Sequence, residues 1–367
     1  MTLQRTPLYE RHTALAARMV PFGGWEMPVQ YSGIADEHHA VRNAAGLFDI
    51  SHMGEVYLGG SGALAFLQHI ATQDVATIGP GQSNYSLMCR PDGGIVDDIF
   101  IYNLGDQYLV VVNASNIAKD IAWMQQHTAG FEVTIENASD HTAMLALQGP
   151  AAEAILSGAT TFEIAAIPFH GVAQAELFGH IPALVARTGY TGEDGFELFV
   201  GNQFAAPLWD ALLTLGMPNG LKPCGLGARD SLRFEACLAL YGHEIADDIN
   251  PYEAKLGWVT KLDKAAFVGS QALRAIKAQG TARKLVGFEM VGRGIARGEY
   301  PIHSVAGERV GYVTTGMPAP TLGRNLGLGF VPSSLASEGS EFEIIVRDKP
   351  VRAKVVKTPF YKPRYKK

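Results

Sequence analysis

The chain has 367 residues, of which 47% are hydrophobic and 18% are charged, a balance that is ordinary for a folded globular protein and excludes a largely disordered chain. This length predicts two or three domains. The formal net charge of −6, from 30 Lys and Arg against 36 Asp and Glu, argues against a dedicated nucleic-acid-binding protein, which usually carries a basic domain.

Neither a membrane segment nor a secretory signal is predicted. No apolar run approaches the roughly 18 residues of a membrane span, and the N-terminus lacks a charged segment followed by an apolar core. Cys89, Cys224 and Cys237 are scattered and include no CxxC pair, so we expect small buried side chains rather than a disulfide framework or a zinc site. A reducing cytoplasm is the expected compartment.

The N-terminal part of the chain predicts three helices and a loop. The expected helices cover residues 8–19, 34–45 and 59–74, and the last of them lies between strands. Residues 21–30 contain several glycines and prolines and are expected to form a loop.

A β-hairpin follows. The segments 99–103 and 108–113 are apolar and β-branched, and Gly105 and Asp106 separate them. A helix over residues 114–127 and a strand over 132–137 come next. The order strand, helix, strand, strand, helix, strand resembles a split βαβ unit.

The rest of the chain predicts helices first and then strands. Beyond residue 264, strand-like segments alternate with Gly/Pro turns, which indicates a separate C-terminal β domain. The expected elements are helices over 151–157, 205–215 and 226–240, a second hairpin around 188–197, and strands over 285–290 and 341–346.

Common catalytic motifs are missing. The chain has no Gly-Lys pair and therefore no P-loop, no G-x-S-x-G element, and no third glycine after Gly225 and Gly227. His38 and His39 are adjacent and would point about 100° apart on a helix, so we interpret them as surface or partner-packing histidines rather than metal ligands. The chemistry must come from carboxylates, an arginine and aromatic side chains.

Asp97 and Asp98 precede an apolar strand. Adjacent strand residues face opposite sides, so one of these acids can face water and the other a pocket, where a carboxylate can hold a cationic substrate or accept a proton. The alternative is a turn acid and a cap. If residues 104–107 form the hairpin loop, Asn113 lies opposite Asp98 on the same face. A carboxylate beside a carboxamide suits the ring nitrogens and amino group of a heterocycle.

Three further residues have a functional and a structural interpretation. Tyr190 can stack on a flat ring and Glu197 can accept bonds from an exocyclic amine, or both can belong to a plain hairpin. Arg229 lies in the first turn of a predicted helix, where a cation opposes the helix dipole and needs an anion. That anion is either Asp230 or a substrate carboxylate.

Two basic features are expected to be structural or solvated. Arg233, one turn after Arg229, is expected to pair with Glu244 or Asp247. The basic and aromatic tail over residues 354–367 is either solvated or binds an acidic ligand or partner.

Nearly the whole chain resembles the aminomethyltransferase family of the glycine cleavage system, the T-proteins. The matching segments are 22–28 (FGGWEMP), 48–55 (FDISHMGE), 93–98 (GGIVDD), 147–150 (LQGP), 187–197 (RTGYTGEDGFE), 225–230 (GLGARD), 241–242 (YG), 250–251 (NP) and 320–323 (PTLG). The resemblance implies an α+β, three-domain cloverleaf. We expect a discontinuous folate-binding domain over 1–50 plus 138–263, a ferredoxin-like inserted domain over 51–137, and a C-terminal β-barrel or jelly-roll domain over 264–367.

The resemblance also implies the reaction. Family members take an aminomethyl group from the lipoyl arm of H-protein and pass its carbon to tetrahydrofolate, giving 5,10-methylenetetrahydrofolate, ammonia and dihydrolipoyl H-protein. Tetrahydrofolate would be the acceptor substrate, with no metal and no tightly bound prosthetic group. Lipoylated H-protein would be the main partner, with transient association with glycine decarboxylase and dihydrolipoyl dehydrogenase. The match begins by residue 6, which implies no transit peptide and a bacterial-type cytoplasmic enzyme without membrane or nucleic-acid partners.

The resemblance assigns roles to single residues. Asp98 matches the family's catalytic carboxylate, and Arg229 the arginine near the glutamate tail of folate. Tyr85, Asn113, Tyr190 and Glu197 match positions that enclose the pterin. Arg364 and Tyr365 lie where the family's C-terminal contact occurs, in a tail that diverges from the family.

Two other functions stay open. One is a stand-alone folate-dependent demethylase of the dimethylglycine or sarcosine type, although such enzymes are commonly fused to flavin domains for which 367 residues leave no space. The other is a non-catalytic folate-binding protein linked to iron–sulfur maintenance. Those relatives carry a Lys-Gly-Cys-Tyr-x-Gly-Gln-Glu element, whereas residues 187–194 here read RTGYTGED and contain no cysteine.

Overall fold

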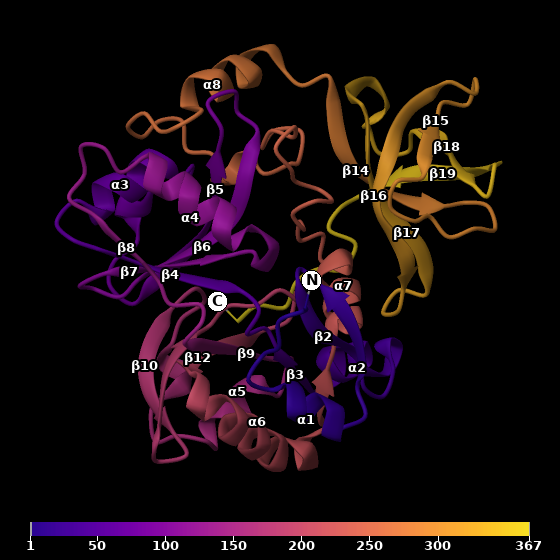
Figure 1. Ribbon diagram of the computed structural model, residues 1–367. Helices are drawn as coiled ribbons and strands as arrows, with labels where there is room; N and C mark the ends of the chain where they lie inside the picture. The colour runs from indigo at the N-terminus through magenta and orange to yellow at the C-terminus, as the bar shows by residue number, and fades with distance from the viewer. Residues whose placement is uncertain (1, 367) are drawn as a thin grey trace.

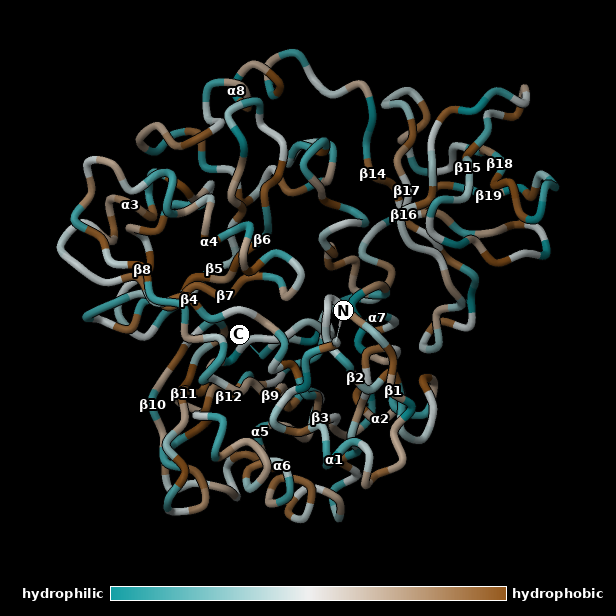
Figure 2. The backbone as a smooth tube through the Cα atoms, viewed as in Figure 1, coloured by the Kyte–Doolittle hydropathy of each residue, from teal (hydrophilic) through white to brown (hydrophobic). Residues whose placement is uncertain are grey.

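The structure is a computed structural model that describes residues 2–366, and it consists of three lobes (Figure 1). Each lobe is built on its own β-sheet or barrel, and a small two-stranded sheet lies beside the first. Hydrophobic residues follow strands such as β7 (Tyr108–Val112), as Figure 2 shows by colour. In the part of the chain that the structure describes, no helix has the length and apolar character needed to cross a membrane.

The first lobe contains a six-stranded sheet of order β10-β11-β12-β9-β3-β13. Strand β3 pairs with β9 although the second lobe separates them in sequence, so this lobe is discontinuous, as the sequence predicts. The strands are β3 (Ala45–Asp49), β9 (Thr142–Gln148), β10 (Val172–Leu177), β11 (Ile181–Ala186), β12 (Gly195–Gly201) and β13 (Leu221–Cys224). The helices are α1 (Tyr9–Ala14), α2 (Ile34–Asn43), α5 (Ala152–Ser157), α6 (Asn202–Gly216) and α7 (Leu226–Glu235).

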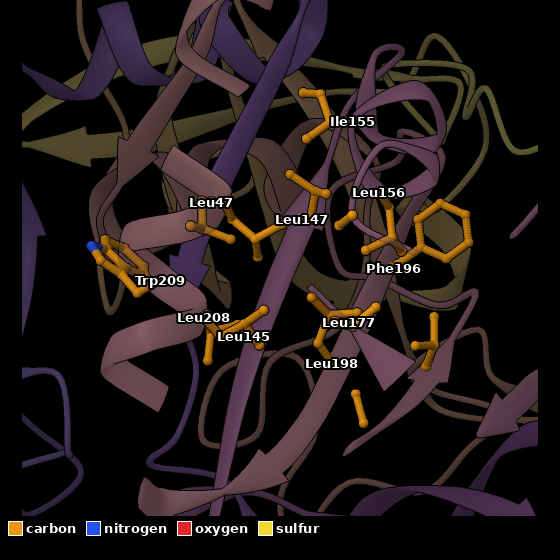
Figure 3. Close-up of a cluster of buried hydrophobic side chains, with 14 of the residues drawn as sticks. Leu47, Leu145, Leu147, Ile155, Leu156, Leu177, Phe196, Leu198, Leu208 and Trp209 are labelled. Carbon is orange, nitrogen blue, oxygen red and sulfur yellow. The ribbon is translucent and has the colours of Figure 1, made fainter. Parts of the chain in front are cut away.

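Apolar side chains of the sheet and of α5 and α6 form the core of this lobe (Figure 3). Leu145, Leu147 and Leu198 project from the strands, and Leu208 and Trp209 project from α6. All five side chains are fully buried. Burying a side chain of this size contributes about 1.5–3 kcal/mol, so this core fixes the sheet that carries part of the site.

The second lobe is the inserted one. Its antiparallel sheet has the order β5-β6-β7-β4-β8. Without the extra edge strand β5, this is the split βαβ arrangement of a ferredoxin-like fold, which confirms the prediction. The elements are β4 (Gly54–Gly59), α3 (Ala63–Ile70), β5 (Gln82–Cys89), β6 (Ile95–Asn103), β7, α4 (Ile117–Gln126) and β8 (Thr134–Asn137).

The third lobe is a closed six-stranded barrel, as predicted. Helix α8 (Ser270–Gln279) precedes it and lies against Gly93 in the turn between β5 and β6 of the inserted lobe. The strands are β14 (Arg283–Met290), β15 (Pro301–His303), β16 (Arg309–Ala319), β17 (Arg324–Pro332), β18 (Glu341–Val346) and β19 (Lys349–Val356). The residue boundaries between the three domains stay predictions.

Three local expectations are wrong. Residues 21–30 are not a loop, because β1 (Arg18–Phe22) and β2 (Trp25–Gln30) form a hairpin. Gly23 and Gly24 make its turn at φ of 56° and 88°, a conformation that glycine adopts without strain. The first helix therefore ends at Ala14, and α7 ends at Glu235 rather than at residue 240.

A buried polar network joins α2 and α7 to the barrel lobe and the C-terminal segment. Arg42 is 3% exposed, and its guanidinium donates to Glu193 at 3.0 Å and to Glu235 at 3.1 Å. His38 is fully buried between Ser231 at 2.8 Å and Thr321 at 2.7 Å. The expectation of a surface histidine is wrong for His38, because it binds hydroxyls from two other segments of the chain. We call these residues the junction network.

Arg233 extends the junction network. Its guanidinium donates to Glu244 at 2.7 Å and to Asp230 at 2.8 Å, which confirms the predicted pairing with Glu244. The other oxygen of Glu244 accepts bonds from Thr314 at 2.6 Å and Thr315 at 2.7 Å in β16. The two buried charges, Arg233 and Glu244, each 1% exposed, therefore both have a partner.

Candidate active site

One half of the candidate site lies on the inserted sheet. Phe100 of β6 pairs with Val111 of β7, which is the predicted register. The Asn113 side-chain amide donates to Oδ1 of Asp98 at 2.6 Å, so the predicted carboxylate–carboxamide pair is confirmed. Tyr85 of β5 lies diagonally across on the same face, and its hydroxyl donates to Oδ2 of Asp98 at 3.1 Å.

This environment controls the ionisation of Asp98. Burial raises the pKa of Asp98 to about 7, and the charge of the neighbouring Asp97 adds to the rise. The hydrogen bonds from Asn113 and Tyr85 act in the opposite direction, because they favour the charged carboxylate. Both protonation states of Asp98 are therefore populated near neutral pH.

Asp97 points to the opposite face of β6. Its side chain is fully buried, so the expectation that one acid of the pair can face water is wrong for Asp97. That face packs on the helices of the inserted lobe, and the carboxylate accepts bonds from the side-chain amides of Asn113 at 2.8 Å and Asn116 at 2.9 Å.

The other half of the site comes from the first lobe. Tyr190 lies in the connection between β11 and β12, and its hydroxyl donates to the carbonyl of Ala239. The guanidinium of Arg229 lies 4.7 Å from the centre of the Tyr190 ring. Burial raises the pKa of Tyr190, and the charge of the Asp98 carboxylate on the inserted lobe adds to the rise.

Glu197 on β12 is 9% exposed and connects the two lobes. Thr188 donates to its Oε2 at 2.5 Å, and Tyr102 of β6 donates to the same oxygen at 3.3 Å. Burial raises the pKa of Glu197, and the bond from Thr188 opposes that rise. Within residues 2–366 no hydrogen bond reaches Oε1, which leaves one oxygen to accept a bond from a ligand.

Arg229 differs from its neighbour Arg233. It is half-buried, burial lowers its pKa, and no carboxylate of residues 2–366 lies within 4.0 Å of its guanidinium. Asp230, the structural alternative, pairs with Arg233 instead. A guanidinium in this position is ready to bind an external anion.

Two residues of this region were not anticipated from the sequence. Trp258, in the short helix Gly257–Val259, stacks on Tyr85 with 6.0 Å between ring centres and 21° between planes, yet it is 60% exposed. His52 is 2% exposed, and burial together with the charge of Arg229 lowers its pKa to about 4. Trp258 differs from an ordinary core tryptophan only in its exposed ring, and this exposure could not be predicted from the sequence.

The C-terminal tail packs on the first lobe, which corrects both earlier interpretations of it. Tyr361 is buried and donates to Glu193 at 2.5 Å. The backbone of Arg364 donates to the carbonyl of Gly192 at 2.8 Å beside Tyr190, whereas its side chain is exposed. Tyr365 is half-buried and stacks on Phe169 at 4.8 Å. The acidic partners of the tail belong to the chain itself.

The three cysteines were expected to be small buried side chains. Cys89 and Cys224 are buried, and Cys237 is half-buried. Two surface cavities of about 720 and 540 Å³ lie elsewhere, beside α6 and beside Lys264. In the described part of the chain, no group of three or more His, Cys, Asp and Glu side chains is arranged to hold a metal ion.

The fold and the site together define a class of protein: a three-lobed α+β enzyme. Its site has a carboxylate, an amide and aromatic rings on the inserted lobe, and on the first lobe a tyrosine, a glutamate and an arginine that pairs with no carboxylate of residues 2–366. Residues 8–264 match the family model described as the GCVT N-terminal domain, and residues 283–362 match the glycine cleavage T-protein C-terminal barrel domain. The chain belongs to the aminomethyltransferase family, the T-proteins of the glycine cleavage system.

Individual relatives agree with this assignment. The chain is 56% identical over 366 residues to the aminomethyltransferase of Herpetosiphon aurantiacus, covering 100% of both chains. It is 50% identical over 363 residues to that of Bacillus subtilis, covering 98% and 99%. The crystal structure of the glycine cleavage system aminomethyltransferase T from Bartonella henselae superimposes with a TM-score of 0.94 at 34% identity, covering 100% of both chains. These matches do not favour the demethylase or the folate-binding alternative.

Proposed function

We propose that this enzyme transfers the one-carbon unit of the S-aminomethyl-dihydrolipoyl group of H-protein to tetrahydrofolate. The products are 5,10-methylenetetrahydrofolate, ammonia and dihydrolipoyl H-protein. The observation that carries the proposal is the half-buried Asp98, held by Asn113 and Tyr85, in a chain of the aminomethyltransferase family. Membership in the family supports glycine breakdown as its context.

Asp98 is the proposed catalytic residue. When ammonia leaves the S–CH2–NH3+ group, or when sulfur leaves its deprotonated form S–CH2–NH2, positive charge develops on the carbon and on the heteroatom, sulfur or nitrogen, that stays bonded to it. A carboxylate already fixed by two hydrogen bonds stabilises that charge without reorganising. Its pKa of about 7 also suits the exchange of a proton with a folate nitrogen at neutral pH.

The remaining site residues are the proposed folate-binding groups. Tyr85, Asn113 and Tyr190 offer rings and an amide to the pterin, and the unoccupied Oε1 of Glu197 suits its amino group. Arg229 would bind a carboxylate of the folate glutamate, which would supply the anion that no carboxylate of residues 2–366 provides there. Arg364 and Tyr365 are the weakest members of this set, because only the backbone of Arg364 reaches the Tyr190 loop.

The proposed partners follow from the reaction. Lipoylated H-protein presents the donor, and glycine decarboxylase and dihydrolipoyl dehydrogenase would associate only transiently. Tetrahydrofolate serves as acceptor substrate, and the proposed chemistry requires neither a metal nor a bound prosthetic group. The cytoplasm is the proposed location, without a membrane or nucleic-acid partner.

A reconstituted assay tests this function. Aminomethylated H-protein and tetrahydrofolate are supplied, and 5,10-methylenetetrahydrofolate is followed for the wild type and Asp98→Asn in parallel. The proposal expects turnover in the wild type and its collapse in the variant. A wild type that binds tetrahydrofolate but does not turn over would transfer the assignment to a demethylase or a folate-binding protein, and methylated amines would then be tested as substrates.

A further inference from the structure

A second pair of carboxyl groups lies behind Asp98, on the other face of β6. Asp120 of α4 is fully buried, and neither of its oxygens meets an N–H or O–H donor within residues 2–366. Its neighbour is the equally buried carboxyl group of Asp97. Two carboxyl groups can form a hydrogen bond to each other only if one of them carries a proton.

The hydrogen bonds show which of the two is charged. Asp97 accepts three N–H bonds: from the Asn113 backbone at 3.2 Å, from the Asn113 side chain at 2.8 Å and from Asn116 at 2.9 Å. Several N–H donors stabilise a carboxylate in its ionised form. Asp120 has no such donors, so a negative charge on Asp120 would be buried without compensation.

Within residues 2–366 no ion pair or hydrogen bond compensates a charge on Asp120. Lys119 precedes it on α4, but the Lys119 ammonium donates to the carbonyl of Val96 at 2.6 Å and to the hydroxyl of Tyr241 at 2.8 Å. Tyr241 in turn donates to Asp247 at 3.1 Å. The proton of the hydrogen bond between the two carboxyl groups therefore belongs to Asp120.

This pair is connected to the catalytic carboxylate. The same Asn113 side-chain nitrogen that binds Asp97 also donates to Asp98 at 2.6 Å. We propose that Asp97 and a protonated Asp120 are positioning residues for Asp98: neutral Asp120 donates a hydrogen bond to ionised Asp97, which holds Asn113 and, through it, the Asp98 carboxylate. This inference rests on the proposed function of Asp98.

The pKa shifts of Asp120 and Asp98 agree with this arrangement. Burial raises the pKa of Asp120 to about 11, and Asp97 adds to the rise while Lys119 opposes it. For Asp98, burial raises the pKa and the charge of Asp97 adds to it, while Tyr85 and Asn113 oppose it. The pH dependence of turnover consequently reports the charge of Asp97.

Three substitutions separate a positioning role from a merely structural one. Asp97→Asn removes the charge behind Asp98, so the acid limb of the kcat profile should move to lower pH as the pKa of Asp98 falls. Asp120→Leu removes the donor to Asp97 and should lower kcat on the order of tenfold, with KM nearly unchanged, because Asp98 loses its alignment. Asp120→Asn restores a neutral N–H donor and should recover most of that loss, with the acid limb where the wild type has it.

The kinetic test is the pH profile of kcat and KM between about pH 5 and 9 for the wild type and these variants. Glu55→Gln is the matched control, because Glu55 is another fully buried carboxyl group without a hydrogen-bond partner in residues 2–366 and is not part of this chain of contacts. A downward shift of the acid limb in Asp120→Asn equal to that in Asp97→Asn would show an ionised Asp120 and overturn the inference. An unshifted limb in Asp97→Asn would also overturn it.

Infrared spectroscopy of the free enzyme gives a readout that does not depend on turnover. At about pH 9 ordinary carboxyl groups are ionised, so Asp120 should contribute to the carbonyl band of protonated carboxyl groups. Asp120→Asn should remove that component, whereas the control Glu55→Gln should leave it in place. If Asp120→Asn leaves this band unchanged, the inference is wrong, whereas a wild type without turnover would contradict only the proposed function.

Discussion

The junction network and the candidate active site differ in how they compensate an arginine side chain. Arg233 is 1% exposed and lies between two carboxylates, whereas Arg229, one turn earlier on α7, is half-buried and has none among residues 2–366. Because a buried charge must be compensated, the paired group holds the lobes together and the unpaired group is free to bind a ligand. The predictions below test this division.

Removing a partner from the junction network should have the largest effect. Arg233→Ala leaves Glu244 buried without its cation, and the loss of one partner from such a pair costs about 3–5 kcal/mol. We expect a correspondingly lower free energy of unfolding in urea, or no soluble folded protein. If the variant is as stable as the wild type, the pair of Arg233 and Glu244 does not stabilise the fold.

Substitution of Asp98 should affect turnover rather than folding. Asp98→Asn keeps the shape of the side chain and should lower kcat by about 10²–10³, the loss expected for one preorganised stabilising group. Tetrahydrofolate affinity should stay within several-fold. Steady-state kinetics and a binding titration check this, and full turnover in Asp98→Asn would remove the proposed catalytic role.

Arg229→Ala should affect binding rather than stability. The substitution removes a charge-assisted contact to folate and should weaken tetrahydrofolate binding about 10- to 100-fold. In the free enzyme the substitution removes the contact of the guanidinium with the Tyr190 ring, so the free energy of unfolding should fall by about 1 kcal/mol or less. Urea unfolding of this variant beside Arg233→Ala gives the direct contrast, and equal destabilisation of both would contradict the division.

The pH dependences of the two regions should have opposite signs. The pKa of Asp98 is raised to about 7, so turnover should rise with pH through about 7. The fold should lose stability between pH about 4, where Asp98 ionises in the unfolded chain, and pH about 7, where it ionises in the folded protein. The hydrogen bond from His38 helps lower the pKa of Glu235 and the charge of Arg233 that of Glu244, so their stabilisation is present above the usual 4.5 and is lost as the pH falls further. Thermal unfolding of wild type and Asp98→Asn at pH 8 should show the variant to be the more stable.

The smallest expected effect concerns the C-terminal segment. Tyr361→Phe removes the hydroxyl that donates to Glu193 and keeps the ring against Arg42. Because Arg42 still compensates Glu193, the free energy of unfolding should fall by only about 1–2 kcal/mol. A larger loss in urea unfolding would mean that the tail contributes more to the junction network than this one bond.

The sequence predicts what local rules control. The hairpin register follows from two short strands and a tight loop, and it placed Asn113 beside Asp98 correctly. The unfavourable position of Arg229 at a helix N-terminus likewise identified it as a residue that needs an anion. The split βαβ order and a separate C-terminal β domain follow from the alternation of elements, whereas the barrel was implied only by the family resemblance.

Contacts between distant segments could not be predicted. Nothing near Tyr361 in the sequence indicates Glu193, and nothing near His38 indicates Thr321, so the docked tail and the buried histidine were missed. Asp120 looks like an ordinary polar helix residue until the packing of α4 on β6 buries it beside Asp97.

The most direct test of this account is a calorimetric titration of wild type and Arg229→Ala with tetrahydrofolate and with tetrahydropterin, which lacks the glutamate. The account predicts that the substitution weakens tetrahydrofolate binding about 10- to 100-fold and leaves tetrahydropterin binding within about twofold, because the guanidinium binds the glutamate carboxylate. Equal weakening of both ligands, or unchanged tetrahydrofolate affinity, would contradict the claim that the unpaired arginine is reserved for that anion.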